Sequence, residues 1–485
     1  MAARQSPLFC EQGVDFAALA KQEVAMGNPS NPVMTARRAG FALRAAQRLI
    51  DAEARFADGT ARFPQDPALA FGLAQTRYEL GDSAADLFAH AAALAPGNRD
   101  VVRNQALALI SEGRGAEARA LLTGELAREP GWLDGHKALA TLEWTSGNRA
   151  QFSSSLAAAC RLQPDNAALW LAWFRNLAQA RDWAGALDVL AQAERQLGST
   201  PAIQVARLFV AVESGAPDAA ELIAATAQFR GDVSSLCRIR HALRQGEPAR
   251  AEAEALPLTA EPSAMLYWPY LSLAWRLLGD DRAQWLDRPG QLIRTFDCGW
   301  SAGELGELAD VLRGLHTAAE PYLEQSVRGG TQTDRSVLLR REPVLQRIKA
   351  RLLELIREYV SDLPAPDPAH PLLGAPREDL LIEGSWSVRL ARQGYNVPHT
   401  HAMGWLSTAF YVALPGPADM GAPPAGHIAF GGPPAELGLT LEPYRTIAPE
   451  PGKLAVFPAA MWHATVPFDE GERLVIAFDI RRPQA

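Results

Sequence analysis

Histidine is scarce in this chain, and two of its nine histidines stand one residue apart. These are His399 and His401, in the stretch NVPHTHAMGWLSTAFYV, at the start of an apolar run. On an extended strand, residues i and i+2 point to the same side, with their Cα atoms about 6–7 Å apart. Two imidazoles that project together in this way can share one cation, so the pair predicts a metal site.

A catalytic metal site needs a third protein ligand from another part of the chain. His463, in the stretch FPAAMWHATVPF, is the best candidate. Three protein ligands that leave open coordination positions are typical of a catalytic site and not of a structural one. The alternative is that the three histidines are core or surface residues held by hydrogen bonds.

Arg473 follows His463 after the segment PFDEGE, which indicates a turn. We therefore expect the two residues on neighbouring strands of a hairpin. A guanidinium is planar and binds a carboxylate through two parallel hydrogen bonds. A metal at one end and an arginine at the other would suit a keto acid with two carboxylates. The alternative role for Arg473 is an ion pair within the sheet.

Two further polar features are candidates for the same site. Arg389, in SWSVRL, is a charge on an apolar strand, expected either to bind the keto acid or substrate or to pair with a structural carboxylate. The segment EQSVRGGTQT, residues 324–333, combines a Gly-Gly pair with many hydrogen-bonding side chains. It is expected either to line the mouth of the site or to pack as an ordered turn on the β-core.

The residues after about 295 indicate the fold that must position these groups. ELGELADVLRGLH and PVLQRIKARLLELIREYVSDL have helical spacing, and the proline-rich LPAPDPAHPLLGAP ends helical structure. Short β-rich runs follow, separated by Gly/Pro turns: SWSVRLA, LSTAFYVAL, GHIAFGG, GKLAVFPA, HATVPF and RLVIAFDI. Many short strands at turn-rich intervals predict a sandwich or a jelly roll.

The first half of the chain is a repeat. Pro96, Pro130 and Pro164 are each 34 residues apart, and Gly113 and Gly147 keep the same spacing. A sustained 34-residue period with turn residues in phase is the tetratricopeptide signature. Each repeat is a helical hairpin in which glycine stands at the turn between the helices and proline ends the second helix.

One hairpin cannot bury its own apolar face, so the repeats are expected to stack into an α-solenoid with a concave groove. The groove suggests binding of a peptide or a protein, and the alternative is a spacer or dimerisation arm. The pattern is regular over about residues 60–200 and degenerate afterwards. The predicted organisation is a partly flexible extension at 1–34, a tetratricopeptide-like solenoid at 35–295 and a β-domain with supporting helices at 296–485.

The composition excludes several classes of protein. The chain has 485 residues, enough for two or three domains, and a net charge of −8 without a Lys/Arg block. This argues against binding of nucleic acid and against a basic membrane-surface helix. No apolar run reaches the ~20 residues of a membrane span, and we expect no export signal. Four widely spaced cysteines fit no zinc or disulfide pattern, so we expect a cytoplasmic protein.

The residues from about 321 to 479 resemble the tetratricopeptide-linked 2-oxoglutarate/Fe(II) oxygenases, which have a double-stranded β-helix core. The resemblance runs through EQSVRGGTQT, GSWSVRL, HTHAMGWLSTAFYVALP, PGKLAVFPAAMWHATVPF and RLVIAFD. It implies Fe(II) held by His399, His401 and His463, and 2-oxoglutarate as co-substrate. The far carboxylate of 2-oxoglutarate would bind Arg473, with Arg389 as a second cofactor-binding candidate. The implied reaction oxidises a substrate C–H bond while 2-oxoglutarate is converted to succinate and carbon dioxide.

One position departs from the family pattern. Most members of the superfamily carry His-x-Asp, which gives two histidine ligands and one carboxylate, whereas this chain has His401 in the Asp position. A neutral third ligand leaves the metal site one unit more positive. The alternative is that His401 lies behind the ligands, although Glu383 and Asp419, the nearest acidic residues in the sequence, are badly placed to replace it.

The sequence therefore predicts an Fe(II)/2-oxoglutarate-dependent dioxygenase that hydroxylates a peptide, a protein or a small molecule, with the repeats as a binding arm. Two alternatives stay open. One is a non-catalytic repeat scaffold whose β-domain binds a ligand. The other is a three-histidine dioxygenase that does not use 2-oxoglutarate. Neither the substrate, nor the type of oxidation, nor the oligomeric state follows from the sequence.

Overall fold

The computed structural model describes residues 31–483, and internal contacts divide them into two compact units. The N-terminal unit comprises residues 31–169 together with Leu338–Gln346. The C-terminal unit comprises the other described residues. Most of the predicted extension at 1–34, like Cys10, lies outside the described residues.

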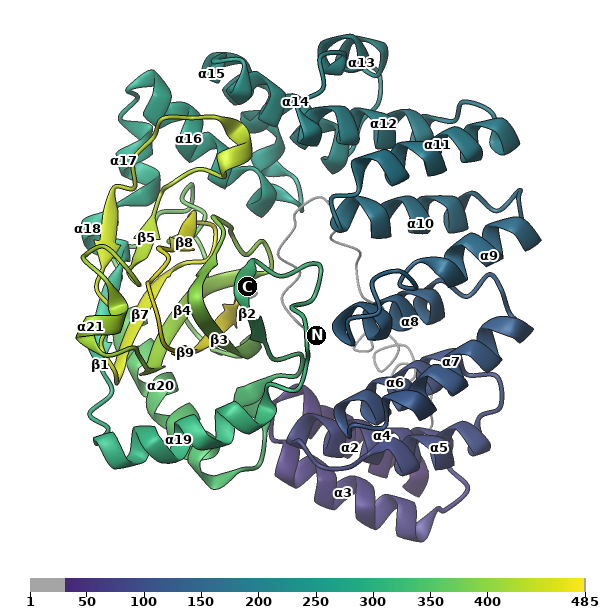
Figure 1. Ribbon diagram of the computed structural model, residues 1–485. Helices are drawn as coiled ribbons and strands as arrows, with labels where there is room; N and C mark the ends of the chain where they lie inside the picture. The colour runs from purple at the N-terminus through teal and green to yellow at the C-terminus, as the bar shows by residue number, and fades with distance from the viewer. Residues whose placement is uncertain (1–30, 484–485) are drawn as a thin grey trace. The chain divides into compact units, whose positions relative to one another are not determined.

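The N-terminal unit is a stack of helices in which each helix packs against the next (Figure 1). These helices are α2 (Pro32–Ala45), α3 (Leu49–Arg62), α4 (Pro67–Leu80), α5 (Ala85–Leu94), α6 (Arg99–Ser111), α7 (Gly115–Arg128), α8 (Leu133–Thr145) and α9 (Ser154–Leu162). Gly113 and Gly147 follow α6 and α8 with φ near +75° and +83°, a left-handed conformation that favours glycine. Pro130 and Pro164 follow α7 and α9, so the turn residues lie where the 34-residue period placed them.

Further helices open the C-terminal unit. They are α10 (Ala167–Gln179), α11 (Trp183–Leu197), α12 (Pro201–Ser214), α13 (Ala219–Ala225), α14 (Asp232–Arg244), α15 (Pro248–Ala255), α16 (Trp268–Leu278), α17 (Arg282–Asp287) and α18 (Pro289–Leu292). The last of them pack directly on the β-structure: the Trp462 indole N–H donates to the Pro269 carbonyl at 2.9 Å, and the Arg244 guanidinium donates to the Glu436 carbonyl. The degenerate helices thus share a core with Leu437 and Trp462, which lie in segments that connect the strands.

Two antiparallel sheets form the rest of the C-terminal unit. The large sheet has the strand order β1-β7-β4-β9-β3-β2 and the small sheet has the order β6-β5-β8. The strands are β1 (Arg294–Asp297), β2 (Val327–Gln332), β3 (Ile382–Asn396), β4 (Gly404–Ala413), β5 (Ile428–Phe430), β6 (Arg445–Ile447), β7 (Lys453–Pro458), β8 (His463–Thr465) and β9 (Arg473–Arg481). Every predicted β-run is a strand, and the sequence patterns missed β1, β2 and β6. The predicted fold class, helical repeats followed by an antiparallel β-domain, is confirmed.

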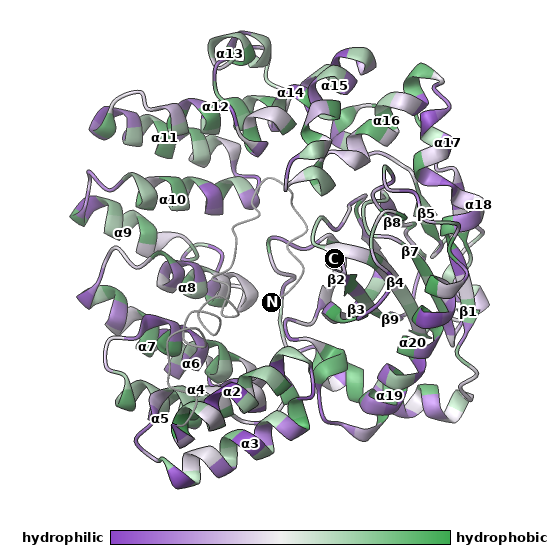
Figure 2. Cartoon of the chain, turned by 180° about the vertical axis from the view of Figure 1, so that it is seen from behind, coloured by the Kyte–Doolittle hydropathy of each residue, from purple (hydrophilic) through white to green (hydrophobic). Residues whose placement is uncertain are grey.

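The two sheets face each other across an apolar core. Tyr411, Phe457 and Val475 of the large sheet pack with Ile428 and Phe430 of the small sheet. In Figure 2 the strands are mainly hydrophobic, whereas the helices carry both hydrophobic and hydrophilic residues. The inner face of the large sheet is therefore buried, and a side chain on this face lies in the protein interior.

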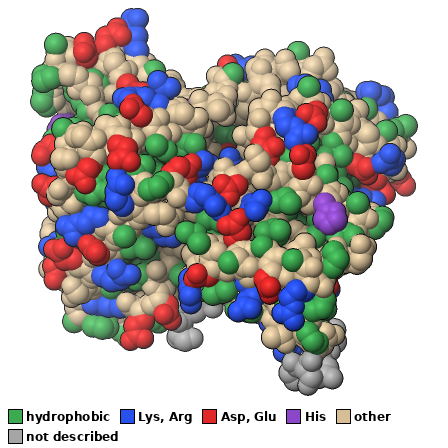
Figure 3. All heavy atoms as spheres, turned by 90° about the horizontal axis from the view of Figure 1, so that it is seen from below, with side chains coloured by type: hydrophobic (Ala, Val, Ile, Leu, Met, Phe, Trp, Pro, Cys, Tyr) green, Lys and Arg blue, Asp and Glu red, His purple; other side chains and the backbone are tan. Residues whose placement is uncertain are grey.

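Two predicted supporting helices are also present, α19 (Ala302–Leu315) and α20 (Pro343–Ser361), together with the short α21 (Pro417–Met420). A capping box between Ser301 and Glu304 fixes the start of α19, which packs against β4. Among the described helices, none combines the length and the apolar character needed to cross a bilayer. On the face drawn in Figure 3, basic and acidic side chains of the described residues are interspersed.

Candidate metal centre

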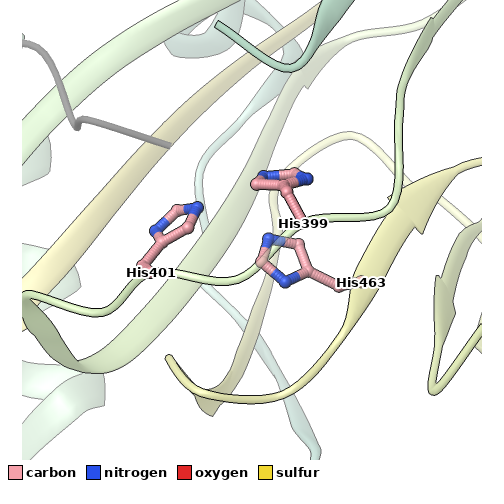
Figure 4. Close-up of side chains that lie close together, drawn as sticks. All are labelled: His399, His401 and His463. Atoms are coloured by element: carbon pink, nitrogen blue, oxygen red, sulfur yellow. The ribbon is translucent and has the colours of Figure 1, made fainter. Parts of the chain in front are cut away.

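His399 and His401 meet His463, which is distant in the sequence, between the two sheets (Figure 4). The backbone N–H of His399 donates to the His463 carbonyl at 3.0 Å, and the reverse bond is 3.1 Å long. His401 is held by a bond from its own N–H to the Ala459 carbonyl at 2.8 Å. The ring centroids of His399 and His463 are 4.1 Å apart, and His401 lies 5.1 Å from each. One nitrogen of each ring lies within 4.8 Å of the other two, so the cluster could hold a metal ion.

The local structure differs from the expectation in two respects. His399 and His401 lie in the connection between β3 and β4 and not on a strand. The two rings are therefore brought together by hydrogen bonds to the main chain of His463 and Ala459, and not by the alternation of side chains along a strand. The predicted hairpin from His463 to Arg473 is wrong, because β8 belongs to the small sheet and β9 to the large sheet. The segment between them crosses from one sheet to the other, as chains do in jelly rolls.

Hydrogen bonds at Nδ1 determine which nitrogen of each ring can bind a metal. The Nδ1 of His399 lies 2.7 Å from the Val397 carbonyl, and the Nδ1 of His463 lies 2.9 Å from the Met461 carbonyl. Carbonyl oxygens only accept hydrogen bonds, so each Nδ1 carries the proton and each Nε2 keeps its lone pair. The Nε2 of His401 is buried and has no hydrogen-bond partner among the described residues.

Burial keeps two of the rings neutral. Burial, with a smaller contribution from the neighbouring His401, lowers the pKa of His399 to about 3. Burial also holds the pKa of His463 well below its usual value, with smaller contributions from the other two histidines. A neutral imidazole is the form that ligates a metal, so His399 and His463 are in the form that binds a cation near neutral pH.

Asp479 is a residue of the site that the sequence patterns did not assign. Its two carboxylate oxygens lie 2.8 and 2.7 Å from the Nδ1 of His401, and both side chains are 4% exposed. The Nδ1 of His401 therefore donates to the carboxylate and leaves Nε2 as the free donor atom. The strand RLVIAFD contained a signal, because Asp479 stands at an even spacing from Arg473 and so on the same face.

Arg473 lies on the face of the large sheet that is turned toward the histidines, because it shares that face with Asp479, which contacts His401. Arg473 is directly opposite Leu390 on the neighbouring strand β3. Further along the same two strands, Trp386 is opposite Ala477, and these residues point to the same face as Arg473. The Trp386 ring lies 5.5 Å from the ring of His401. Arg473 is 2% exposed, and no carboxylate among the described residues pairs with it.

The surroundings of Arg473 leave hydrogen-bonding groups free for a ligand. Its guanidinium lies 5.1 Å from the centre of the Tyr411 ring. The Arg473 Nε and the Tyr411 hydroxyl are both buried, and neither has a well-formed hydrogen bond to another described residue. Burial lowers the pKa of Arg473 and raises that of Tyr411, which reflects the cost of charge at this depth. A carboxylate bound here would offset that cost.

Arg389, the second predicted cofactor-binding residue, is not brought to the histidines. It lies opposite Leu474, one residue from Arg473, and therefore on the other face of the sheet. Its Nε donates to Glu472 at 2.6 Å, and Arg313 binds the same carboxylate. This is the alternative that the sequence left open, an ion pair with a structural carboxylate.

The segment 324–333 contains β2, the edge strand beside β3. Ser326 lies 3.4 Å from the Nε2 of His399 and accepts a hydrogen bond from Asn396. Gln332 lies opposite Val388 on the inner face, is buried, and has no partner for either end of its carboxamide. Part of the segment thus lines the centre, while the rest packs on the sheet.

The other histidines of the β-domain have separate surroundings. His316 bonds to the hydroxyls of Thr331 and Ser387, and burial lowers its pKa to about 4. His370 bonds to the Leu286 carbonyl through Nε2. His427 precedes β5, and its Nδ1 is buried without a partner. None of these three belongs to the cluster of described residues that could hold a metal.

Comparison with known proteins agrees with this geometry. Residues 384–479 match a family model described as "Putative 2OG-Fe(II) oxygenase". A search of the curated proteins gives no match.

Similar solved structures fall into two groups. A prolyl-4-hydroxylase from Pseudomonas putida is 16% identical and covers 40% of this chain and 94% of its own, with a TM-score of 0.28. HygX from Streptomyces hygroscopicus, with nickel and 2-oxoglutarate bound, is 12% identical and covers 40% and 84%, with a TM-score of 0.28. A tetratricopeptide repeat protein from Parabacteroides merdae is 15% identical and covers 46% and 91%, also with a TM-score of 0.28.

Proposed function

We propose that this chain, which carries a 2-oxoglutarate/Fe(II) oxygenase domain at residues 384–479, is an Fe(II)- and 2-oxoglutarate-dependent dioxygenase. It hydroxylates a peptide, a protein or a small molecule. The observation that carries the proposal is the meeting of three buried imidazoles next to the large-sheet face that holds Asp479 and Arg473, and Arg473 has no acidic partner among the described residues. A divalent metal and an acid with two carboxylates would suit this arrangement.

The residues present fit an iron ion. His399, His401 and His463 would hold it through Nε2, and imidazole nitrogen is a suitable ligand for iron. The fit rests on His401, whose buried Nε2 has no protein partner and would otherwise be a costly unpaired group. When bound, iron supplies the redox chemistry by which oxygen and 2-oxoglutarate oxidise a C–H bond.

The protein's own side chains bind and orient the co-substrate. The Arg473 guanidinium would bind the far carboxylate of 2-oxoglutarate, and the Tyr411 hydroxyl would donate a further hydrogen bond to it. Phe457 lies 4.7 Å from His463, and Phe430 packs on Phe457 at 4.9 Å. These rings keep water away from the centre, which strengthens the charged interactions there.

The helical repeats are proposed as the arm that binds the substrate. A stack of helical hairpins presents an extended surface of the kind that binds peptides. This role is a proposal about the repeats themselves and is independent of the oxygenase chemistry.

The test measures 2-oxoglutarate turnover and binding separately. With Fe(II) and oxygen, the purified protein is expected to convert 2-oxoglutarate to succinate. Without oxygen, 2-oxoglutarate should produce a metal-to-ligand absorption band. Arg473→Ala should raise the KM for 2-oxoglutarate roughly 100-fold, since truncating one partner of a buried charge pair costs about 2–5 kcal/mol. The matched control is Arg389→Ala, on the other face of the sheet, which should leave the KM unchanged.

The possible results separate the alternatives. Iron binding without the absorption band would favour a three-histidine dioxygenase that needs no keto acid. Failure to bind either iron or 2-oxoglutarate would leave a repeat scaffold with a non-catalytic β-domain.

A further inference from the structure

A metal held by three histidines poses an electrostatic problem in this protein. The cluster that could hold the ion contains no carboxylate, so a divalent cation would bring two uncompensated positive charges to a buried site. Burial of charge without a counter-charge is costly. A compensating anion has to lie close by if the site is to bind metal tightly.

Asp479 is the acidic group closest to the cluster by hydrogen bonding. Both of its oxygens are within 2.8 Å of the Nδ1 of His401, and it is 3% exposed. Among the described residues, no lysine or arginine pairs with it, so its charge is not used elsewhere. Gly404 packs directly against Asp479. A Cβ added at Gly404 would lie 3.2 Å from the Cβ of Asp479 and 3.0 Å from the Cβ of Ala459.

We propose that Asp479 supplies, through His401, the negative charge that a directly bound aspartate supplies in the usual two-histidine, one-carboxylate site. Asp479 is a positioning residue in this role. It fixes the proton of His401 on Nδ1, holds the ring in place and makes Nε2 a stronger donor to the metal. The inference rests on the metal-binding part of the proposed function, and needs neither 2-oxoglutarate nor turnover.

The experiment measures metal affinity and not activity. Cobalt(II) is titrated into the full-length protein, and binding is followed by its visible absorption bands. Asp479→Asn keeps the size of the side chain and removes its charge, and it is expected to weaken cobalt binding by about 10–100-fold. The double variant His401→Asp/Asp479→Asn returns a carboxylate to the ligand position, and it should recover much of that loss.

Asp287→Asn is the matched control. Asp287 is also a buried aspartate of the C-terminal unit, but its carboxylate accepts a hydrogen bond from the Ser272 hydroxyl and lies outside the histidine cluster. This variant should bind cobalt within about twofold of the parent protein. Asp479→Glu, which keeps the charge, should bind cobalt more tightly than Asp479→Asn. Asp479→Ala also removes the charge and covers the case in which the asparagine variant does not fold.

The outcomes are distinguishable. If neither Asp479→Asn nor, where that variant does not fold, Asp479→Ala binds cobalt more weakly than the parent protein, the role of Asp479 is refuted. If the parent protein itself binds no cobalt, the metal site fails, and both this inference and the proposed function fall with it. Loss of 2-oxoglutarate binding alone would remove the proposed function and leave the role of Asp479 intact.

Discussion

Buried side chains with unsatisfied hydrogen-bonding groups define the candidate centre at the scale of residues. His401, Arg473, Tyr411 and Gln332 each have at least one buried polar atom without a partner. Such atoms cost about 1–3 kcal/mol each when they are left unpaired. Single atoms of this kind also occur away from the centre, for example in Asn176 and Tyr444, but these four side chains gather around the centre, which supports a site that is completed by what it binds.

Gln332 allows this interpretation to be tested without any ligand. Gln332→Met replaces a buried carboxamide that has no partner at either end by an apolar side chain of similar shape. The free energy of unfolding of the metal-free protein should therefore rise by about 1–2 kcal/mol, as measured by urea denaturation. In the control Gln179→Met, a hydrogen bond to Glu324 is lost, and stability should stay constant or fall. A loss of stability in Gln332→Met would mean that the carboxamide has a structural role.

At the scale of elements, the close pairing of β2 with β3 determines how the edge strand reaches the centre. A Cβ at Gly330 would lie 2.3 Å from the Arg389 carbonyl oxygen and 2.8 Å from the Leu390 Cα. The neighbouring Gly329 has a φ of +68° and marks a break in the pairing register. Glycines at these two positions allow the edge strand to approach β3 and to bring Ser326 to the centre.

Gly330→Ala is expected to disturb this pairing. Because the clash involves backbone atoms that cannot move aside, the substitution should lower the free energy of unfolding by about 1–3 kcal/mol and speed hydrogen exchange in β2. The control is Gly306→Ala in α19, where a Cβ meets nothing within 4 Å. It should leave stability unchanged or raise it by up to about 1 kcal/mol, because alanine is the better helix former. Equal stability of the two variants would contradict the proposed role of the close approach.

The chain divides into two compact units at the scale of the whole molecule, and only one of them contains the metal centre. Each unit has its own buried core, formed by helix faces in the N-terminal unit and by helices and strands in the C-terminal unit. The helices α14 to α17 share a core with Trp462 and belong to the unit that holds the histidines. A ligand of the centre should therefore stabilise one unit selectively.

Calorimetry can test this selectivity. Thermal unfolding of the metal-free protein is expected to show two transitions. Cobalt(II) at about 100 times its Kd should stabilise one of them by about 2.7 kcal/mol and leave the other in place. The shift should disappear in His463→Ala, which removes a ligand. If the protein shows a single transition, or if cobalt(II) shifts two transitions equally, the units do not unfold independently.

Much of the architecture follows from local chemistry and is therefore readable in the sequence. The spacing of Pro96, Pro130 and Pro164 determines where helices end, because proline cannot continue a helix. The alternation of apolar residues identifies strands such as β4 and β9, because side chains on a strand alternate between two faces. The histidines of the centre also followed from residue type and spacing, and the structure brings them together.

Only the tertiary structure determined which strands pair and which side chains face the centre. It placed β8 and β9 in different sheets, Arg389 on the face away from the histidines in an ion pair with Glu472, and Asp479 behind His401. These outcomes depend on which strands pair and on which face is buried, and a shift of one residue in register exchanges the two faces. Local sequence determines the period of an element, but only long-range packing selects its partner and the face it buries.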